Sequence, residues 1–311
     1  MEFLAIADLH LTTETPRSRK FGYSNQILKK FEQILILTKN KTTSNLLLIA
    51  GDFFDSPHPV QVPYSLTSKV IEIIKKHNVT IFVVPGQHDL RYHTKGLQNT
   101  PLGTLQSAGV IKILNGKEKT YHDIMPEYSF VGQGWDEKLI VKDADVLITH
   151  RMVVKNKLWK DQTDYITAKA LMKKYPNISC IISGDNHLPH FLKTNNRLQI
   201  NCGSIPRKTK LQVDYQPYAW KVNLETRKVT KIKIKVLPKN EVFDFEKIEK
   251  TEKETERKNA ALEKIPIFIQ QLFDKNNKAP TFPVILRKLI KEMKPNQDVQ
   301  NIINTTMENL K

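Results

Sequence analysis

Acidic, amide and imidazole side chains recur directly after apolar segments of this chain. They are Asp8 and His10 after EFLAIA, Asp52 after NLLLIAG, Gln87, His88 and Asp89 after VTIFVVPG, His150 after ADVLIT, and Asp185 and His187 after SCIISG. A single aspartate or histidine at such a place is usually structural, for example in a turn. Their recurrence after five apolar runs instead predicts one shared site. Carboxylate oxygens and imidazole nitrogens are common ligands of divalent cations.

This set of residue types suits the hydrolysis of phosphate esters. Two divalent cations about 3.5–4 Å apart can bind the phosphate, activate a water molecule and offset the charge of the leaving oxygen. Such a pair needs mixed oxygen and nitrogen ligands with one carboxylate shared between the ions. A further imidazole nearby can protonate the leaving group. The residues therefore predict a two-metal site that acts on phosphodiesters.

The first half of the chain alternates strand and helix patterns. EFLAIA, NLLLIA and VTIFVV are continuous apolar runs, which are typical of buried parallel strands. Residues 24–38 and 65–77 place apolar side chains at helical spacing between these runs. The order predicts a largely parallel sheet with helices packed outside it. Because the carboxyl ends of parallel strands line one crevice, we expect the polar side chains to converge there.

The second half predicts a second sheet and a distinct tail. ADVLITH, ISCIISG and RLQINC read as strands, and residues 218–238 read as a hairpin. We expect these segments to form a sheet packed on the first, which gives a two-sheet α/β/β/α sandwich. After Pro238 the composition becomes charged, so we divide the chain into residues 1–238 and 239–311. Apolar residues at helical spacing in 279–293 and 296–310 predict a small helical module behind a charged linker.

The motifs ADLHL, AGDFFD, PGQHD, LITH and GDNH, in this order and spacing, resemble those of calcineurin-type metallophosphoesterases. Within that superfamily the chain is similar to the SbcD-type nucleases of DNA double-strand-break repair, including phage recombination endonuclease subunits. Those proteins begin almost at residue 1 with such a strand, and NCGSIPR at residues 201–207 resembles the segment that often follows their last metal motif. The resemblance covers about residues 1–237.

The resemblance implies the roles of the site residues. One metal would be held by Asp8, His10, Asp52 and His187, and Asp52 would bridge to a second metal bound by Gln87, His150 and Asp185. His88 would act on the phosphate or the leaving group, and Asp89 would orient it.

Two positions depart from the family pattern. The family typically has Asn where Gln87 stands and His where Asp185 stands. Gln is one methylene longer, and Asp replaces a neutral nitrogen with an anionic oxygen. The second site becomes harder and more negative, which favours Mn²⁺ or Mg²⁺ over Zn²⁺. We predict two Mn²⁺ ions, with Mg²⁺ as the alternative.

The charge of the chain predicts a polyanionic partner. Lys and Arg number 49 against 32 Asp and Glu, which gives a net charge of +17. Nucleic acid is the first candidate, although an AT-rich genome also enriches lysine. Contacts with the DNA backbone are expected from Arg17, Arg19, Lys20, Arg207 and Lys208. The alternative is that these residues lie in solvated loops.

The resemblance also implies macromolecular partners. The C-terminal helices would bind the coiled coil of an SMC-like ATPase of the SbcC type, and the nuclease domain would form a homodimer. Alternatively, the helices pack on one another or on the nuclease domain. The predicted function is a metal-dependent DNA exo- or endonuclease in end processing and recombination. The alternatives are a protein phosphatase, a cyclic-nucleotide phosphodiesterase, or a non-enzymatic DNA-end-binding scaffold with a degraded metal site.

Cysteine usage and hydropathy bear on the compartment. Cys180 and Cys202, the only two cysteines, both lie in apolar strand-like segments. We expect buried free thiols, which fit the reducing cytoplasm of a bacterium or of a phage-infected host. The N-terminus does not resemble a signal peptide, and no apolar run approaches the roughly 20 residues that span a bilayer. We therefore expect no membrane association.

Overall fold

The computed structural model describes residues 1–39, 44–91, 96–123, 125–194, 196–274, 282–293 and 301. The chain forms two compact units, Met1–Asp244 and Phe245–Lys311. All residues predicted for the metal site lie in the first unit. That unit includes the short helix α5 (Lys239–Val242) and Phe243, because the side chains of Val242 and Phe243 are buried in it.

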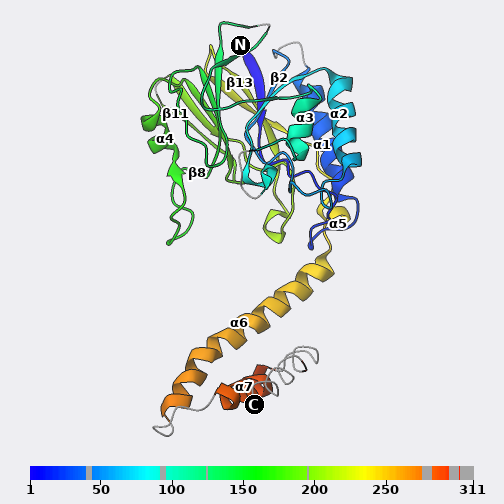
Figure 1. The fold of residues 1–311 in the computed structure, drawn as a ribbon, viewed down its shortest axis with the longest axis vertical. Helices are drawn as coiled ribbons and strands as arrows, with labels where there is room; N and C mark the ends of the chain where they lie inside the picture. The colour runs from blue at the N-terminus through cyan, green and yellow to red at the C-terminus, as the bar shows by residue number, and fades with distance from the viewer. Residues whose placement is uncertain are drawn as a thin grey trace. The chain divides into compact units, whose positions relative to one another are not determined.

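The first sheet contains the strands expected from the first half of the chain. β1 (Glu2–Ile6), β2 (Leu46–Ile49), β3 (Thr80–Val83) and β4 (Lys112–Ile113) lie parallel in this order. Helices α1 (Tyr23–Thr38), α2 (Tyr64–His77) and α3 (Pro101–Ser107) flank this sheet (Figure 1). Their apolar residues, among them Phe31, Val70 and Leu105, pack in one cluster with side chains of the strands. The predicted alternation of strands and helices is confirmed.

The second sheet has the order β11-β12-β10-β7-β6-β5. Its parallel strands are β6 (Ser129–Gln133), β7 (Val146–Arg151), β10 (Cys180–Asp185) and β12 (Arg197–Asn201). The antiparallel edge strands are β5 (Thr120–Tyr121) and β11 (His190–Thr194). Helix α4 (Ala168–Lys174) packs on this sheet through Leu171 and Met172. A separate short pair joins β8 (Val153–Val154) to β9 (Ile166–Thr167).

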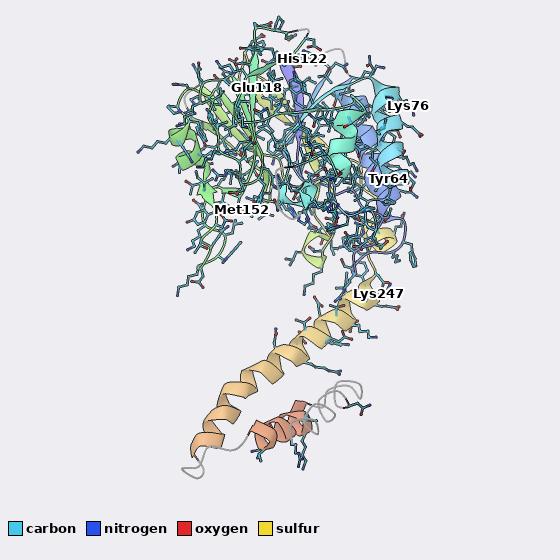
Figure 2. All side chains as sticks on the ribbon, viewed as in Figure 1. Tyr64, Lys76, Glu118, His122, Met152 and Lys247 are labelled. Atoms are coloured by element: carbon cyan, nitrogen blue, oxygen red, sulfur yellow. The ribbon has the colours of Figure 1, made fainter. Side chains whose placement is uncertain are left out.

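The main core lies between the two sheets. Phe3, Phe82 and Trp220 of the first sheet pack in one cluster with Phe130 and Ile182 of the second, and side chains fill the body of the unit (Figure 2). Cys180 and Cys202 belong to the same cluster as buried free thiols, as predicted. The α/β/β/α sandwich is therefore confirmed.

The position of the predicted hairpin differs from the expectation. β13 (Tyr218–Asn223) and β14 (Lys228–Lys233) pair with each other, but β13 also pairs antiparallel with β1. The hairpin thus extends the first sheet rather than the second. The physical reason is that β1 is buried and would otherwise leave one row of backbone groups unpaired. β14, with its exposed lysines, suits the edge.

The second unit contains α6 (Phe245–Asp274) and α7 (Phe282–Met293). Except for residue 301, the helix predicted over residues 296–310 lies outside the described residues. None of the helices in the described ranges is both long enough and apolar enough to span a membrane.

Candidate metal centre

The turns that follow the central strands have an unusual backbone. Asp8, His10, Asp52 and Asp185 have φ of 51°, 46°, 49° and 72°. Residues other than glycine rarely adopt this left-handed conformation, and such strained positions cluster at functional sites. Each turn redirects the chain at the carboxyl end of its strand, which brings these side chains to one place.

Backbone hydrogen bonds hold the first two turns in register. The N–H of Asp8 donates to the carbonyl of Gly51, and the N–H of His10 donates to the carbonyl of Asp52, both at 3.0 Å. The loops after β1 and β2 therefore continue side by side beyond the sheet. This fixes the spacing between Asp8 and Asp52.

Two glycines make room for the ligands. A Cβ at Gly51, which has φ of 89°, would lie 2.1 Å from Nδ1 of His150. A Cβ at Gly86 would lie 2.0 Å from Oδ1 of Asp52. The backbone thus approaches these side chains more closely than any other residue type allows.

The first predicted metal site has converging donor atoms. Nε2 of His10 lies 3.3 Å from Nε2 of His187 and 3.8 Å from Oδ2 of Asp52, and Nε2 of His187 lies 3.9 Å from Oδ1 of Asp8. Donor atoms of Asp8, His10 and His187 all lie within 4.8 Å of one another. Two nitrogens about 2.1 Å from one ion stand roughly 3 Å apart, so the two imidazoles fit a shared cation.

The second predicted site lies beside the first. Nε2 of His150 is 3.4 Å from Oδ2 of Asp52 and 2.8 Å from Oε1 of Gln87, whose Nε2 donates to Oδ1 of Asp185 at 3.3 Å. Nδ1 of His150 lies 2.7 Å from the carbonyl of Ala50, which turns Nε2 toward the centre. Gln87 begins the 3₁₀ turn η1 (Gln87–Asp89), and from there its longer side chain reaches this cluster. The structure therefore brings together all seven predicted ligands.

The charges of this centre also fit cations. Burial raises the pKa of Asp8 well above its usual range; His150 opposes this effect, and the nearby Asp52 and Asp185 add to it. Burial also opposes ionisation of Asp52, but His150 and His10 outweigh it and lower the pKa of Asp52. For His150 the carboxylates outweigh burial and raise the pKa to about 10. Divalent cations would relieve the repulsion among these buried carboxylates.

The structure corrects the role expected for Asp89. Its buried carboxylate accepts hydrogen bonds from the backbone N–H groups of Phe53, Phe54 and Gly86 at 2.9–3.2 Å. Asp89 therefore holds the Asp52 loop against the β3 loop. The group that lies 3.0 Å from Nδ1 of His88 is instead the backbone carbonyl of Asp55. The N–H of His88 also donates to Oδ1 of Asp52 at 3.0 Å, which places His88 next to the centre.

Asp55 is a site residue that our reading of the sequence missed. Its Oδ1 lies 2.8 Å from Nδ1 of His10 and accepts from Nζ of Lys208 at 2.5 Å. Burial opposes ionisation of Asp55, but His10 and Lys208 outweigh it and lower the pKa to about 2. A carboxylate behind a ligating histidine orients the ring and makes its other nitrogen more basic. The signal was present as the second aspartate of AGDFFD.

The predicted DNA contacts fall into two groups. Arg17 and Lys20 are exposed and Lys208 is half-buried, so their contact with DNA stays a prediction. Arg19 and Arg207 are buried, 4% and 5% exposed, and donate to backbone carbonyls. This burial contradicts the expectation that they lie in a surface loop and grip the DNA backbone. The reason is that their guanidinium groups donate hydrogen bonds to the carbonyls of Val213, Leu237 and Val242.

Sequence reasoning also missed the loop that follows β8. Residues 155–161 are exposed and include Lys155, Lys157 and Lys160, and Trp159 is 57% exposed. This loop follows β8, which comes directly after β7, the strand that carries His150, and it extends beyond β8 (Figure 1). A lone tryptophan between lysines gave no periodic signal, which explains why the sequence pattern did not reveal it.

The fold and the donor set define the class of metal-dependent phosphoesterases. A family model described as calcineurin-like phosphoesterase matches residues 1–189. The chain belongs to the calcineurin-like phosphoesterase family, which confirms the superfamily expected from the motifs. Membership implies a hydrolase that acts on phosphate esters with divalent metals.

Solved structures with similar folds include several hydrolases. An archaeal phosphodiesterase shows 13% identity and a TM-score of 0.42 over 75% of this chain and 99% of its own. PptH, a phosphopantetheinyl hydrolase from Mycobacterium tuberculosis, shows 12% identity and a TM-score of 0.41 over 74% and 95%. The nuclease MPE from Pseudomonas putida shows 12% identity and a TM-score of 0.32 over 70% and 82%. Similarity at this level does not indicate the substrate of the present chain.

Proposed function

We propose that this chain is a metal-dependent DNA nuclease that hydrolyses phosphodiester bonds in DNA end processing and recombination. The family membership supports phosphoester hydrolysis. The observation that carries the choice of DNA is the exposed loop after β8, which contains Trp159 and three lysines; β8 itself follows the strand that supplies His150. Lysines contact backbone phosphates, and an exposed aromatic ring stacks on unpaired bases. The net charge of +17 agrees with this choice.

The geometry of the centre supports the roles that the resemblance implies. Asp8, His10 and His187, with Asp52 as the shared ligand, would hold one cation, and Gln87, His150 and Asp185 would complete the second site. When bound, divalent cations supply Lewis acidity toward the phosphodiester and lower the pKa of water. We favour Mn²⁺ because the second site offers mainly oxygen ligands.

His88 is the proposed general acid. In its imidazolium form, His88 donates Nδ1–H to the carbonyl of Asp55 and can transfer the proton on Nε2 to the 3′-oxygen as the phosphorus–oxygen bond breaks, which leaves a neutral imidazole. Asp55 would keep His10 in the orientation that presents Nε2 to the metal.

A paired assay tests this function. The full chain with Mn²⁺ is offered linear duplex DNA and, in parallel, bis-(p-nitrophenyl) phosphate. We expect cleavage of both substrates, and exchange of Trp159 for Ala should lower DNA cleavage about tenfold while sparing the small diester. Cleavage of the small diester alone would assign another phosphoesterase activity. Binding of DNA ends without cleavage of either substrate would assign a scaffold. Equal activity with Zn²⁺ or after chelation would contradict the choice of Mn²⁺.

We further propose that the unit Phe245–Lys311 binds the coiled coil of an SMC-like ATPase and that two copies of the first unit form a homodimer. The support is the apolar residues at helical spacing in α7 and the resemblance to SbcD-type nucleases. The exchange Leu286→Asp should abolish co-purification with such an ATPase and leave hydrolysis of the small diester intact. Light scattering tests the homodimer. The two buried thiols agree with a reducing cytoplasm as the place of action.

A further inference from the structure

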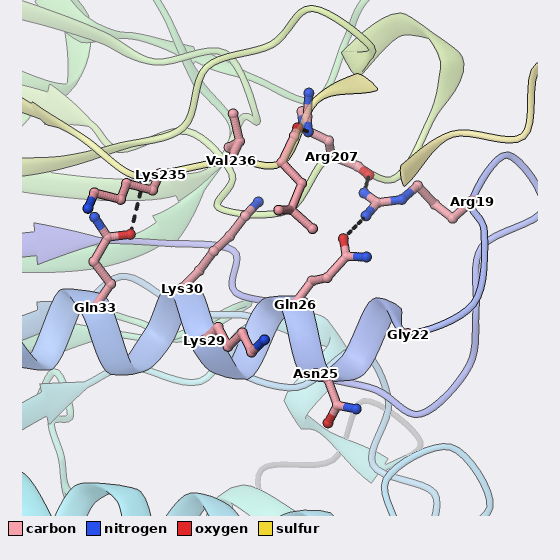
Figure 3. A pocket seen from close by; sticks show the side chains of 11 residues that line it. Arg19, Gly22, Asn25, Gln26, Lys29, Lys30, Gln33, Arg207, Lys235 and Val236 are labelled. Atoms are coloured by element: carbon pink, nitrogen blue, oxygen red, sulfur yellow. Dashed lines mark hydrogen bonds between the residues drawn. The ribbon is translucent and has the colours of Figure 1, made fainter. Parts of the chain in front are cut away.

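A second charged region of the first unit is lined by none of the proposed metal ligands. It is a cavity of about 680 Å³ between α1 and the segment that follows β14. Figure 3 shows Lys30 and Gln26 rising from α1 toward Arg207 and Val236, with Arg19 at one end. Its basic lining residues are Arg19, Lys29, Lys30, Arg207 and Lys235. In the part of the chain that the structure describes, no aspartate or glutamate lines this cavity.

Lys30 is an unusual residue for the buried side of a helix. It is 8% exposed, and its ammonium group donates to the backbone carbonyl of Ile205 at 2.8 Å. An ammonium has three donors, so one carbonyl satisfies only part of its capacity. Burial, together with the positive charges of Arg207 and Arg19, lowers the pKa of Lys30 to about 7. A methionine or leucine would fill this position at less cost to the folded state.

Arg207 brings a second buried cation with an unused donor. Its Nη1 and Nη2 donate to the carbonyls of Val213 and Leu237 at 3.0 and 2.5 Å. Its Nε is buried without a hydrogen-bond partner among the described residues. Arg19 similarly donates to the carbonyls of Val242 and Arg207 and to Oε1 of Gln26. Carbonyl and amide dipoles therefore surround these cations, whereas no acidic side chain among the described residues lines the cavity.

We propose that this cavity binds a small phosphorylated molecule of nucleotide size. A phosphate group would supply the missing negative charge and accept the remaining donors of Lys30 and Arg207. The volume lies within the roughly 300–1,000 Å³ of typical small-molecule sites. The amide side chains of Asn25, Gln26 and Gln33 offer both donors and acceptors to the rest of such a molecule.

This site does not rest on the proposed nuclease activity. Its lining contains none of the predicted metal ligands or His88. Binding in the cavity can therefore be tested whatever substrate the metal centre hydrolyses.

Calorimetric titration of the full metal-loaded chain tests the proposal. The probe is α,β-methylene-ADP, whose phosphates are joined by a carbon bridge that hydrolysis of a phosphate ester does not cut. The test variant carries Lys29→Gln and Lys235→Gln, two exposed positions on the cavity wall. A matched variant carries Lys69→Gln and Lys75→Gln, two exposed lysines of α2. Both variants lose two positive charges, so a general effect of charge should change binding equally in the two. Binding of the probe at the metal centre should also be the same in both variants.

We expect the cavity variant to weaken binding of the probe at least tenfold and the α2 variant to change it less than twofold. Lys30→Met should also weaken binding at least tenfold. Unchanged affinity in the cavity variant would overturn the proposal. Adenosine binding as tightly as the probe would overturn the role of the phosphate. If the cavity variant weakened binding of a single-stranded oligonucleotide and not of the probe, the cavity would belong to a nucleic-acid surface instead.

Discussion

The metal centre and the basic cavity, both in the first unit, concentrate buried charge of opposite sign. At the metal centre, Asp8 and Asp52 are buried side by side near Asp185. In the cavity, Lys30 and Arg207 are buried where no acidic side chain lines the wall in the described part of the chain. Burying like charges together costs stability unless an opposite charge compensates. Both regions therefore match the needs of a ligand, a cation at the metal centre and an anion in the cavity.

The two regions differ in how their side chains are held. The carboxylates and imidazoles follow central parallel strands, and left-handed turns with backbone hydrogen bonds fix them. The cations of the cavity come from a helix, from the loop before it and from segments after β12 and β14. We therefore expect substitutions of the metal ligands to cause large losses of catalytic activity. Substitutions in the cavity should act on binding and stability in graded fashion.

The largest effect is expected from Asp52→Ala. Asp52 is the carboxylate shared by both predicted sites and lies next to His10 and His150. Its loss should remove Mn²⁺ binding and reduce hydrolysis of both diesters by about 10⁴-fold or more. Equilibrium dialysis with Mn²⁺ and initial rates measure the two effects. Full nuclease activity in this variant would end the assignment of the metal centre.

His88→Ala separates acid catalysis from metal binding. Because His88 supplies a proton rather than a ligand in this account, Mn²⁺ content should stay as in the natural chain. Cleavage of DNA should fall about 10²–10⁴-fold. Bis-(p-nitrophenyl) phosphate has a better leaving group and needs less help from an acid, so its hydrolysis should fall less. A parallel loss of Mn²⁺ would show that His88 is a ligand instead.

Asp55→Asn tests the carboxylate behind His10. The amide keeps the shape of the side chain but removes the charge next to Nδ1 of His10. We expect Mn²⁺ affinity or activity to fall about 10–100-fold. Asp89→Asn provides the contrast, because Asp89 holds backbone N–H groups and should change the melting temperature more than the affinity for Mn²⁺.

The smallest effect is expected on stability, where Lys30→Met should stabilise the folded chain rather than impair it. The pKa of Lys30 is about 7 in the folded chain against 10.5 for an ordinary lysine, so between these pH values the unfolded chain binds more protons. The stability of the natural chain therefore rises with pH across this window. The variant should be more stable by about 1–3 kcal/mol at pH 6, with the gain shrinking toward pH 10. Denaturant unfolding at both pH values measures it, and a variant less stable at pH 6 would contradict the cost assigned to Lys30.

The fold and the convergence of the predicted ligands were predictable from the sequence for one physical reason. Each ligand follows an apolar run that can only be a buried strand, so position along the chain determines position at the sheet edge. The partner of β1 could not be predicted in this way, because strand pairing between Tyr218–Asn223 and Glu2–Ile6 depends on contacts distant in sequence.

The roles of individual side chains could not be predicted in the same way, because they depend on contacts in three dimensions. Asp89 follows His88 directly, yet its carboxylate faces the backbone of Phe53 and Phe54. Arg19 and Arg207 look like loop residues in the sequence, and only their distant carbonyl partners show that they are buried. Net charge predicted an anionic partner, but it could not show that part of this charge lines a cavity.

The most direct test of the metal centre is anomalous diffraction at the manganese edge from crystals of the full chain grown with Mn²⁺. A two-metal centre predicts two peaks about 3.5–4 Å apart on either side of Asp52, one next to His10 and His187 and the other next to Gln87, His150 and Asp185. A single peak away from Asp52, or no peak within reach of Asp8 and His187, would contradict it.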